Sequence, residues 1–276
     1  KINRRSFLAA AGLTAAALAL TACGGSASST ASSTASSAAS SEAASTSAAA
    51  ELTTVEAGKL TMATNAAFPP YEMTTDAGEF EGIDIDTAKA IAEKLGLELQ
   101  IDDMDFDAAL LSVQQGKADI VMAGVTVTDE RKAVMDFSDS YATGIQSIIV
   151  PNDSDIASPD DLAGKKIGTQ RGTTGYIYCS DDFGEDSVVA YDSGLTAVQA
   201  LNNGQVDAVV IDNAPATEYV AANPGLKVLD TSYAEEDYAI GMAKGSALED
   251  AVNKALEELK ADGTLQAIVD KYITAE

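Results

Sequence analysis

The run TVTDERKAVMDFS, residues 126–138, holds the side chain with the clearest chemical meaning in this sequence. It follows the apolar stretch DIVMAG, which is typical of a buried strand. Its first four residues match a helix-start pattern, so unpaired backbone N–H groups that favour an anion are expected there. The planar fork of Arg131 fits a carboxylate with two parallel hydrogen bonds. These residues predict a carboxylate site, but a surface ion pair of Arg131 with Asp129 or Asp136 would fit the same pattern.

Other kinds of chemistry are excluded by residue type. The chain contains no histidine, which removes Ser-His-Asp and Cys-His nucleophilic schemes and the common zinc sites. Asp103, Asp105 and Asp107 have the spacing that begins a calcium loop. However, Ala108 and Gln114 stand where that loop needs Gly and Glu. We therefore expect no metal and no cofactor. The net charge of −26 disfavours nucleic acid as a partner.

The N-terminus has the pattern of an export signal. A basic start precedes an apolar stretch, residues 7–20, that is too short to span a bilayer. The tetrapeptide Leu-Thr-Ala-Cys, ending at Cys23, resembles the bacterial lipoprotein box, although a chance Cys is the alternative. We predict a signal peptide over 1–22, lipidation at Cys23 and a flexible Ser/Ala/Thr-rich tether over 23–57. The folded part would then be anchored on the extracytoplasmic face of the membrane.

The elements that must position Arg131 occur in two copies. FDAALLSVQQGKADIVMAG and GLTAVQALNNGQVDAVVID each begin with apolar residues at helical spacing and end in a short apolar strand. Between helix and strand, Gly116 corresponds to Gly204 and Asp119 to Asp207, both pairs 88 residues apart. Strands that alternate with helices predict an α/β protein with mainly parallel strands, here built as two lobes of like topology.

Ligands in open α/β sheets bind outside the carboxyl ends of the strands, and small-molecule sites favour domain interfaces. The strand ends are therefore the places where we expect a site. They are Asn65, Gly124–Thr126, Gln170–Thr174 and Asp212.

The segments around these strand ends resemble the solute-binding proteins of polar amino acid ABC transporters, of the glutamine-binding type (bacterial extracellular solute-binding proteins, family 3). The resemblance implies a two-lobed, periplasmic-binding-protein-like α/β fold of type II, in which hinged lobes close on a ligand. The matching segments are ATNAAFPPYE (63–72), GIDIDTAKAIAEKLG (82–96), AGVTVTDERKAVMDFSDSYA (123–142), GTTG (172–175) and DAVVIDNAP (207–215). The implied lobes are 58–141 with 240–276, and 146–236, joined by hinges at about 141–145 and 236–240.

The resemblance also implies roles for individual residues. Arg131 would clamp the α-carboxylate of the ligand, with backbone donors from Thr173 and Thr174. Asp212 would pair with the α-ammonium group, although its position also suits a helix N-cap. Thr126 would contact both groups. The turn of Ala123 and Gly124 would offer the ammonium group a carbonyl.

The ligand side chain is less well specified. Phe68 and Phe106 match aromatic residues that sandwich it in the family. Asn65 and Gln170 are amides, which donate and accept hydrogen bonds but do not neutralise a cation. They favour a neutral polar side chain, such as that of glutamine or cystine. An arginine or other cationic ligand is the alternative, and the acidic surface would attract one.

These observations predict a monomeric protein that captures a polar L-amino acid outside the cytoplasm and hands it to ABC transporter permease subunits. Two other functions use the same fold. A dehydratase-type enzyme would need a general acid in the cleft, and Asn65 and Gln170 are both neutral, so we expect no enzyme activity. A sensory ligand-binding subunit remains the other alternative.

Overall fold

The computed structural model of this protein describes residues 52–273. The predicted signal peptide over 1–22, the lipidation site at Cys23 and most of the predicted tether lie outside the described residues. Within the part that is described, no helix is both long and apolar enough to cross a membrane.

One five-stranded sheet begins with β1 (Lys59–Thr64), a strand that is almost wholly buried. β1 runs parallel to both of its neighbours, whereas β14 lies antiparallel to β6 and β7. The strand order is β5 (Glu98–Asp103), β1, β6 (Ile120–Val121), β14 (Gly241–Ala243) and β7 (Met135–Phe137).

A second, six-stranded sheet is formed by later segments of the chain. β9 (Ile167–Gln170) lies parallel to its two neighbours, and the long strand β8 (Ala142–Pro151) pairs antiparallel with three others. The order is β10 (Val188–Tyr191), β9, β11 (Ala208–Asp212), β8 and β12 (Leu226–Val228), with β13 (Ala234–Tyr238) also on β8. The chain passes between the two large sheets twice, from β7 to β8 and from β13 to β14.

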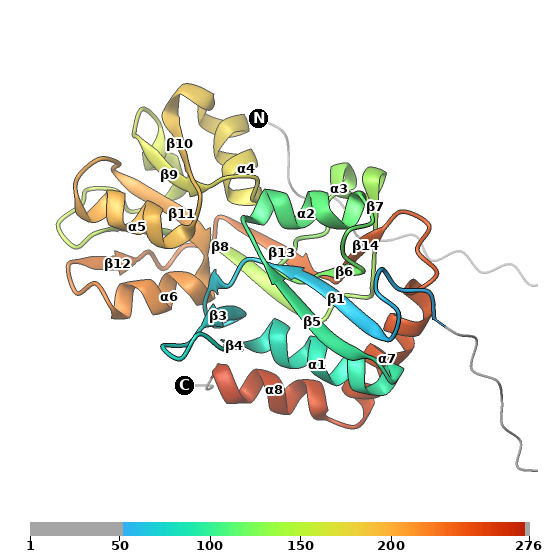
Figure 1. Cartoon of the computed structure of the whole chain (residues 1–276). Coiled ribbons are helices and arrows are strands. Elements are labelled where there is room, and N and C mark those ends of the chain that lie inside the picture. The colour runs from blue at the N-terminus through green and yellow to red at the C-terminus, as the bar shows by residue number, and fades with distance from the viewer. Residues whose placement is uncertain (1–51, 274–276) are drawn as a thin grey trace, which may run out of the picture. The chain divides into compact units, whose positions relative to one another are not determined.

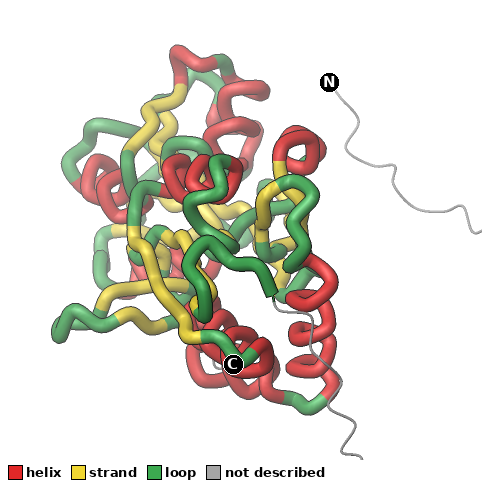
Figure 2. Tube along the Cα trace, turned by 45° about the vertical axis from the view of Figure 1, so that its right-hand side comes forward, coloured by secondary structure: helices red, strands yellow, loops and turns green. Residues whose placement is uncertain are grey.

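Helices lie outside the strands of both sheets, as the red and yellow segments of Figure 2 show. The first sheet carries α1 (Ile83–Leu95), α2 (Phe106–Gln114), α3 (Asp129–Val134), α7 (Glu249–Ala261) and α8 (Thr264–Tyr272). The second carries α4 (Thr174–Phe183), α5 (Gly194–Asn202) and α6 (Asn213–Ala221), with 3-10 turns at Pro159–Leu162 and Glu185–Ser187. A small hairpin sheet joins β2 (Ala67–Phe68), β3 (Glu72–Thr74) and β4 (Phe80–Glu81).

The two sequence copies fold alike. In the first, α2 leads to β6, which runs parallel to β1, and in the second, α5 leads to β11, which runs parallel to β9. Gly116 and Gly204 follow the two helices with φ of 66° and 67°, a left-handed conformation that glycine adopts without strain. The α/β fold class predicted from the alternating pattern is confirmed, but the expectation of mainly parallel strands is wrong. The strands β8 and β14, which follow the two crossings between the sheets, pair antiparallel with every neighbour.

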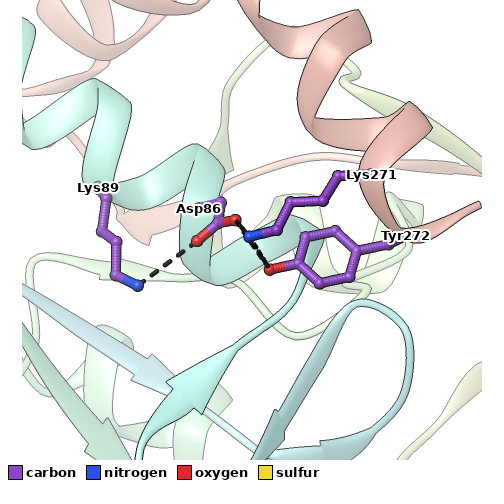
Figure 3. A network of polar contacts seen from close by, with 4 residues as sticks. All are labelled: Asp86, Lys89, Lys271 and Tyr272. Carbon is purple, nitrogen blue, oxygen red and sulfur yellow. Dashed lines mark hydrogen bonds and ion pairs between the residues drawn. The ribbon is translucent and has the colours of Figure 1, made fainter.

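The C-terminal helices return to cover α1 (Figure 1). Val252, Ala255, Leu256 and Leu259 of α7 form one buried face at the spacing of an amphipathic helix. At the end of α8, Lys271 Nζ and Tyr272 Oη donate to Asp86 of α1 at 2.7 and 2.8 Å (Figure 3). Because these groups are partly exposed, the apolar face contributes most of the packing energy and the polar contacts fix the docking angle.

Candidate ligand-binding site

The strand ends that the sequence singled out meet at one pocket. Every residue predicted for the site lines it, and Glu72 joins them although the sequence did not single it out. The lining residues are Asn65, Phe68, Glu72, Phe106, Ala123, Gly124, Thr126, Arg131, Gln170, Thr173, Thr174 and Asp212.

Two helix starts frame this pocket. Thr128 caps α3, and its side-chain oxygen accepts a hydrogen bond from Arg131 N at 3.1 Å. Thr173 caps α4 in the same way, accepting from Tyr176 N at 3.3 Å. A helix therefore starts in the predicted run, but its cap is Thr128 rather than Thr126, with which the pattern begins, because the Thr126 hydroxyl donates to Glu236 instead. Because α4 carries positive partial charge at its N-terminus, its first turn favours an anion at this edge of the pocket.

Arg131 is buried, with 8% of its surface exposed. Its Nη1 donates to the carbonyl of Thr126 at 2.8 Å, and its Nη2 donates to the carbonyl of Gly172 at 3.1 Å. The guanidinium lies over the ring of Phe106, 5.4 Å from the centroid. Burial lowers the pKa of Arg131, against the opposing charge of Glu236.

The alternative of a surface ion pair for Arg131 is wrong. Asp136 pairs instead with Lys244 Nζ at 2.6 Å. Among residues 52–273, no carboxylate lies within ion-pair distance of Arg131. A buried guanidinium that contacts only neutral carbonyls and a ring retains capacity for an anion.

Asp212 lies on the other side of the pocket and is also 8% exposed. Its carboxylate accepts from Gln146 Nε2 at 2.9 Å and from the hydroxyl of Tyr238. Gln146 Nε2 also donates to Glu236 at 3.0 Å, and Thr126 Oγ1 donates to the same Glu236 oxygen at 3.0 Å. Burial, then the charge of Glu236, raise the pKa of Asp212 to about 7.

The alternative role predicted for Asp212, as the N-cap of a helix, agrees with its position in the chain but not with its hydrogen bonds. Asp212 precedes α6, but its side chain makes no capping hydrogen bond. The carboxylate turns instead toward the buried polar groups of β8 and β13. It has two hydrogen-bond donors there and no cationic partner among the described residues.

The two amides meet across the pocket. Gln170 Nε2 donates to Asn65 Oδ1 at 2.8 Å, and Asn65 Nδ2 donates to the carbonyl of Met104, also at 2.8 Å. Phe68 stacks on Tyr71 with ring centroids 5.9 Å apart. Phe68 and Phe106, the two predicted aromatic residues, both line the pocket. The ring of Phe106 also packs against the guanidinium of Arg131.

Position 124 requires glycine, because a side chain there would clash. Its φ is +55°, and a Cβ there would lie 2.9 Å from Cε1 of Phe68. Its N–H donates to Asp84 at 2.9 Å, and Tyr141 Oη donates to the other oxygen of the same carboxylate at 2.7 Å. Because glycine has no side chain, the backbone of this turn lies close to Phe68 and forms part of the pocket wall.

Glu72 is the pocket residue that sequence reasoning missed. It is fully buried, and its carboxyl group shares a hydrogen bond with the carboxylate of Asp84. Burial, then the nearby charge of Asp84, raise the pKa of Glu72 well above its usual range. Its place follows from the hairpin register, which the sequence did not show: Glu72 is the register partner of Phe68, so the two side chains share a face.

Contacts across the pocket join the segments that carry the two large sheets. Besides the Gln170–Asn65 and Arg131–Gly172 hydrogen bonds, Tyr219 Oη donates to the carbonyl of Ala67 at 2.6 Å. The described structure is thus closed around the pocket.

Comparisons with known proteins agree with this geometry. At 33% identity, the chain aligns along its whole length with 98% of a probable histidine-binding protein of Neisseria gonorrhoeae. The L-cystine-binding protein TcyJ of Escherichia coli is 32% identical over 80% of this chain and 85% of its own. The arginine-, lysine-, histidine-binding protein ArtJ of Geobacillus stearothermophilus superposes with a TM-score of 0.76, at 35% identity over 79% of this chain and 96% of its own. Residues 60–275 match the model of the bacterial extracellular solute-binding proteins, family 3, and the chain belongs to that family, with its two-lobed type II fold.

Proposed function

We propose that this protein captures a polar L-amino acid outside the cytoplasm and delivers it to the permease of an ABC importer. The observation that carries the proposal is the pair of buried, uncompensated charges in one pocket, Arg131 and Asp212. Isolated buried charges are costly. The α-carboxylate and α-ammonium groups of an amino acid supply the two missing counter-charges at once.

The surroundings of each charge support this orientation. The carboxylate would take two parallel hydrogen bonds from Arg131 in place of the carbonyls of Thr126 and Gly172. Thr173 and Thr174, at the start of α4, lie in the same pocket and add backbone donors and a favourable helix dipole. The ammonium group would face Asp212 and the Ala123–Gly124 turn.

Entry of the ligand requires the pocket to open. The hydrogen bonds Gln170–Asn65, Arg131–Gly172 and Tyr219–Ala67 close it in this structure. The lobes proposed from the sequence, 58–141 with 240–276 and 146–236, would separate about the two crossings at 141–145 and 236–240. Closure on the ligand would then mark the loaded protein for the permease.

The place of action follows from the family and from the N-terminal sequence. The family is extracellular. Lipidation at Cys23 and a tether over 23–57 would hold a monomer close to its permease at the outer face of the membrane.

Two classes of ligand side chain fit the family. The relatives described above are named for histidine, for cystine, and for arginine, lysine and histidine. The Asn65–Gln170 amide pair favours a neutral polar side chain, such as that of glutamine or cystine, whereas the net charge of −26 favours a cationic one, such as that of arginine. None of these relatives is named as an enzyme, which favours capture over turnover.

The test is calorimetric titration of the purified protein, unfolded and refolded to release carried ligand, against the twenty amino acids, cystine and ornithine. We expect one or a few L-amino acids to bind near micromolar, about −8 kcal/mol. Arg131→Ala should lose that binding, whereas Arg171→Ala should retain it, because Arg171 is half exposed and pairs with Asp192 at the surface. If no amino acid binds, or if Arg131→Ala binds as well as the parent, the proposal is wrong.

A further inference from the structure

Strand β13 buries the middle one of three consecutive acids. Glu235 and Asp237 are exposed, whereas Glu236 between them is only 5% exposed. Because side chains alternate between the two faces of a strand, Glu236 shares its face with Tyr238, whose hydroxyl donates to Asp212. A carboxylate is costly to bury, so an apolar residue would suit this face better for packing alone. The acid at position 236 therefore needs another explanation.

Glu236 accepts hydrogen bonds from both ends of the ligand site. Its Oε2 accepts from Thr126 Oγ1 and from Gln146 Nε2, each at 3.0 Å. Thr126 lies at the end proposed for the α-carboxylate, where its carbonyl accepts from Arg131. Gln146 lies at the end proposed for the α-ammonium group, where the same Nε2 donates to Asp212 at 2.9 Å. Glu236 is not among the pocket-lining residues, so it connects the two ends without touching the ligand.

The shared amide brings two buried carboxyl groups close together. Gln146 Nε2 donates to Asp212 and to Glu236, and Oε1 of Glu236 is buried with no hydrogen-bond partner among the described residues. Neighbouring like charges oppose each other's ionisation, and the charge of Glu236 adds to the effect of burial in raising the pKa of Asp212. The other charged or titratable groups that act on this pair are Arg131, Tyr71, Glu72 and Tyr238.

We propose that Glu236 is a positioning residue of the ligand site, which orients Thr126 and Gln146 at the two ends of the ligand and places a second negative charge behind Asp212. With a ligand bound, this charge adds to the attraction on the α-ammonium group. Without one, it favours a proton on Asp212, and the arriving ammonium group returns that proton to the solvent. The inference rests on the proposed function, because it assumes that an amino acid occupies the pocket.

The competing explanation is a purely structural one. Glu236 would then only accept the hydrogen bonds of Thr126 and Gln146 and fill the space beside them. A glutamine at position 236 would do both, because its amide oxygen accepts the same two donors and its shape is nearly the same. In that case Glu236→Gln leaves the affinity for the ligand unchanged, or changes it by the same factor at every pH.

The experiment compares ligand affinity at pH 8 and at pH 5 in the parent protein and in Glu236→Gln. Arginine and glutamine are titrated calorimetrically into the refolded proteins, because neither side chain changes its charge in this range. At pH 8, Glu236→Gln should bind about fivefold more weakly, since the ammonium group loses the attraction of a second charge. Between pH 8 and pH 5 it should lose only about 10-fold in affinity, where the parent loses close to 100-fold, because Asp212 then ionises more readily.

Two further variants separate the charge of Glu236 from its reach. Glu235→Gln removes the same charge one residue earlier, on the exposed face of β13, and should keep both the parent affinity and its pH dependence. Glu236→Asp keeps the charge but is one methylene shorter, so it cannot hold both Thr126 and Gln146 in the same place. It should weaken binding about 10-fold at both pH values and keep the pH dependence of the parent.

The outcomes separate the two proposals. If no amino acid binds the parent protein, the transport function is wrong and the role of Glu236 falls with it. If the parent binds, but Glu236→Gln loses as much affinity between pH 8 and pH 5 as the parent does, or Glu235→Gln flattens the profile equally, only the Glu236 proposal is overturned. Where Glu236→Gln fails to fold, Glu236→Asp decides, because parent affinity at both pH values or a flattened profile in that variant contradicts the proposal.

Discussion

Protonation of Asp212 should control ligand affinity in the neutral pH range. The carboxyl group must be ionised to pair with the α-ammonium group of an amino acid. In the closed, ligand-free structure, burial and then Glu236 raise its pKa to about 7. A fall in pH below that value converts more of the protein to the protonated form, which offers the ammonium group a neutral partner. Affinity should therefore decrease as the pH falls.

The size of the effect follows from the fraction of protein in the binding-competent form, since the apparent Kd is the intrinsic Kd divided by that fraction. With a pKa of about 7, roughly nine-tenths of Asp212 is ionised at pH 8 and about one-hundredth at pH 5. The apparent Kd should rise about tenfold per pH unit below 7, and close to 100-fold from pH 8 to pH 5.

The assay is calorimetric titration across pH 5–8 with a neutral amino acid such as glutamine, because its side chain carries no group that titrates in this range. Asp212→Asn is the control. It should bind about 10- to 100-fold more weakly at pH 8, because the ammonium group loses a charged partner, and its affinity should hardly depend on pH. A flat profile for the parent protein, or a slope that persists in Asp212→Asn, would refute the role assigned to Asp212.

Three further perturbations test the same site. Arg131→Lys should weaken binding about 100-fold by calorimetry, since an ammonium group cannot reproduce the two-point clamp, whereas Arg171→Lys should have no effect. Tyr219→Phe loses the hydrogen bond to Ala67 that closes the pocket and should weaken binding about fivefold with little change in Tm. In ligand-free protein, the folded pKa of Asp212 lies above its unfolded value, so its contribution to stability is full below about pH 4 and is lost as the pH rises through 7. Asp212→Asn should therefore raise the Tm at pH 8, with a gain of up to about 4 kcal/mol in unfolding free energy, and should leave the Tm unchanged at pH 4.

The parts of the site that local patterns encode could be predicted from the sequence. A helix start leaves donors at a strand end, and an arginine in its first turn fits a carboxylate in two places, so residue types and spacing make Arg131 a candidate. They do not distinguish that role from a surface ion pair, which the resemblance to the family disfavours. The repeat of helix, glycine and strand indicates two lobes and places Asp212 at a strand end. These features depend on residues close together in the chain, whose geometry the sequence constrains directly.

The missed features depend on tertiary enclosure. Glu72 follows two prolines and a tyrosine, a context that is equally typical of an exposed turn, and its complete burial results from its place beside Asp84 on a distant segment. Gln146 and Glu236 lie in strands where polar residues usually face solvent, yet β8 and β13 place them beside Asp212. No spacing rule predicts which polar residue of a strand will be covered by another lobe.

The distribution of charge in the pocket connects structure to transport. In the closed pocket without ligand, Asp212 and Glu236 are buried, and no cation of the described residues pairs with them. Arg131 is buried too, and no anion of these residues pairs with it. Burying uncompensated charge is unfavourable, so closure without ligand is penalised by the same groups that bind the ligand. In the proposed orientation, an amino acid would remove that penalty only in the closed state, because its two charged ends would meet Arg131 and Asp212 together only there. The ligand would then have a higher affinity for the closed form, and this difference in affinity is what a ligand needs to shift the protein toward the closed form.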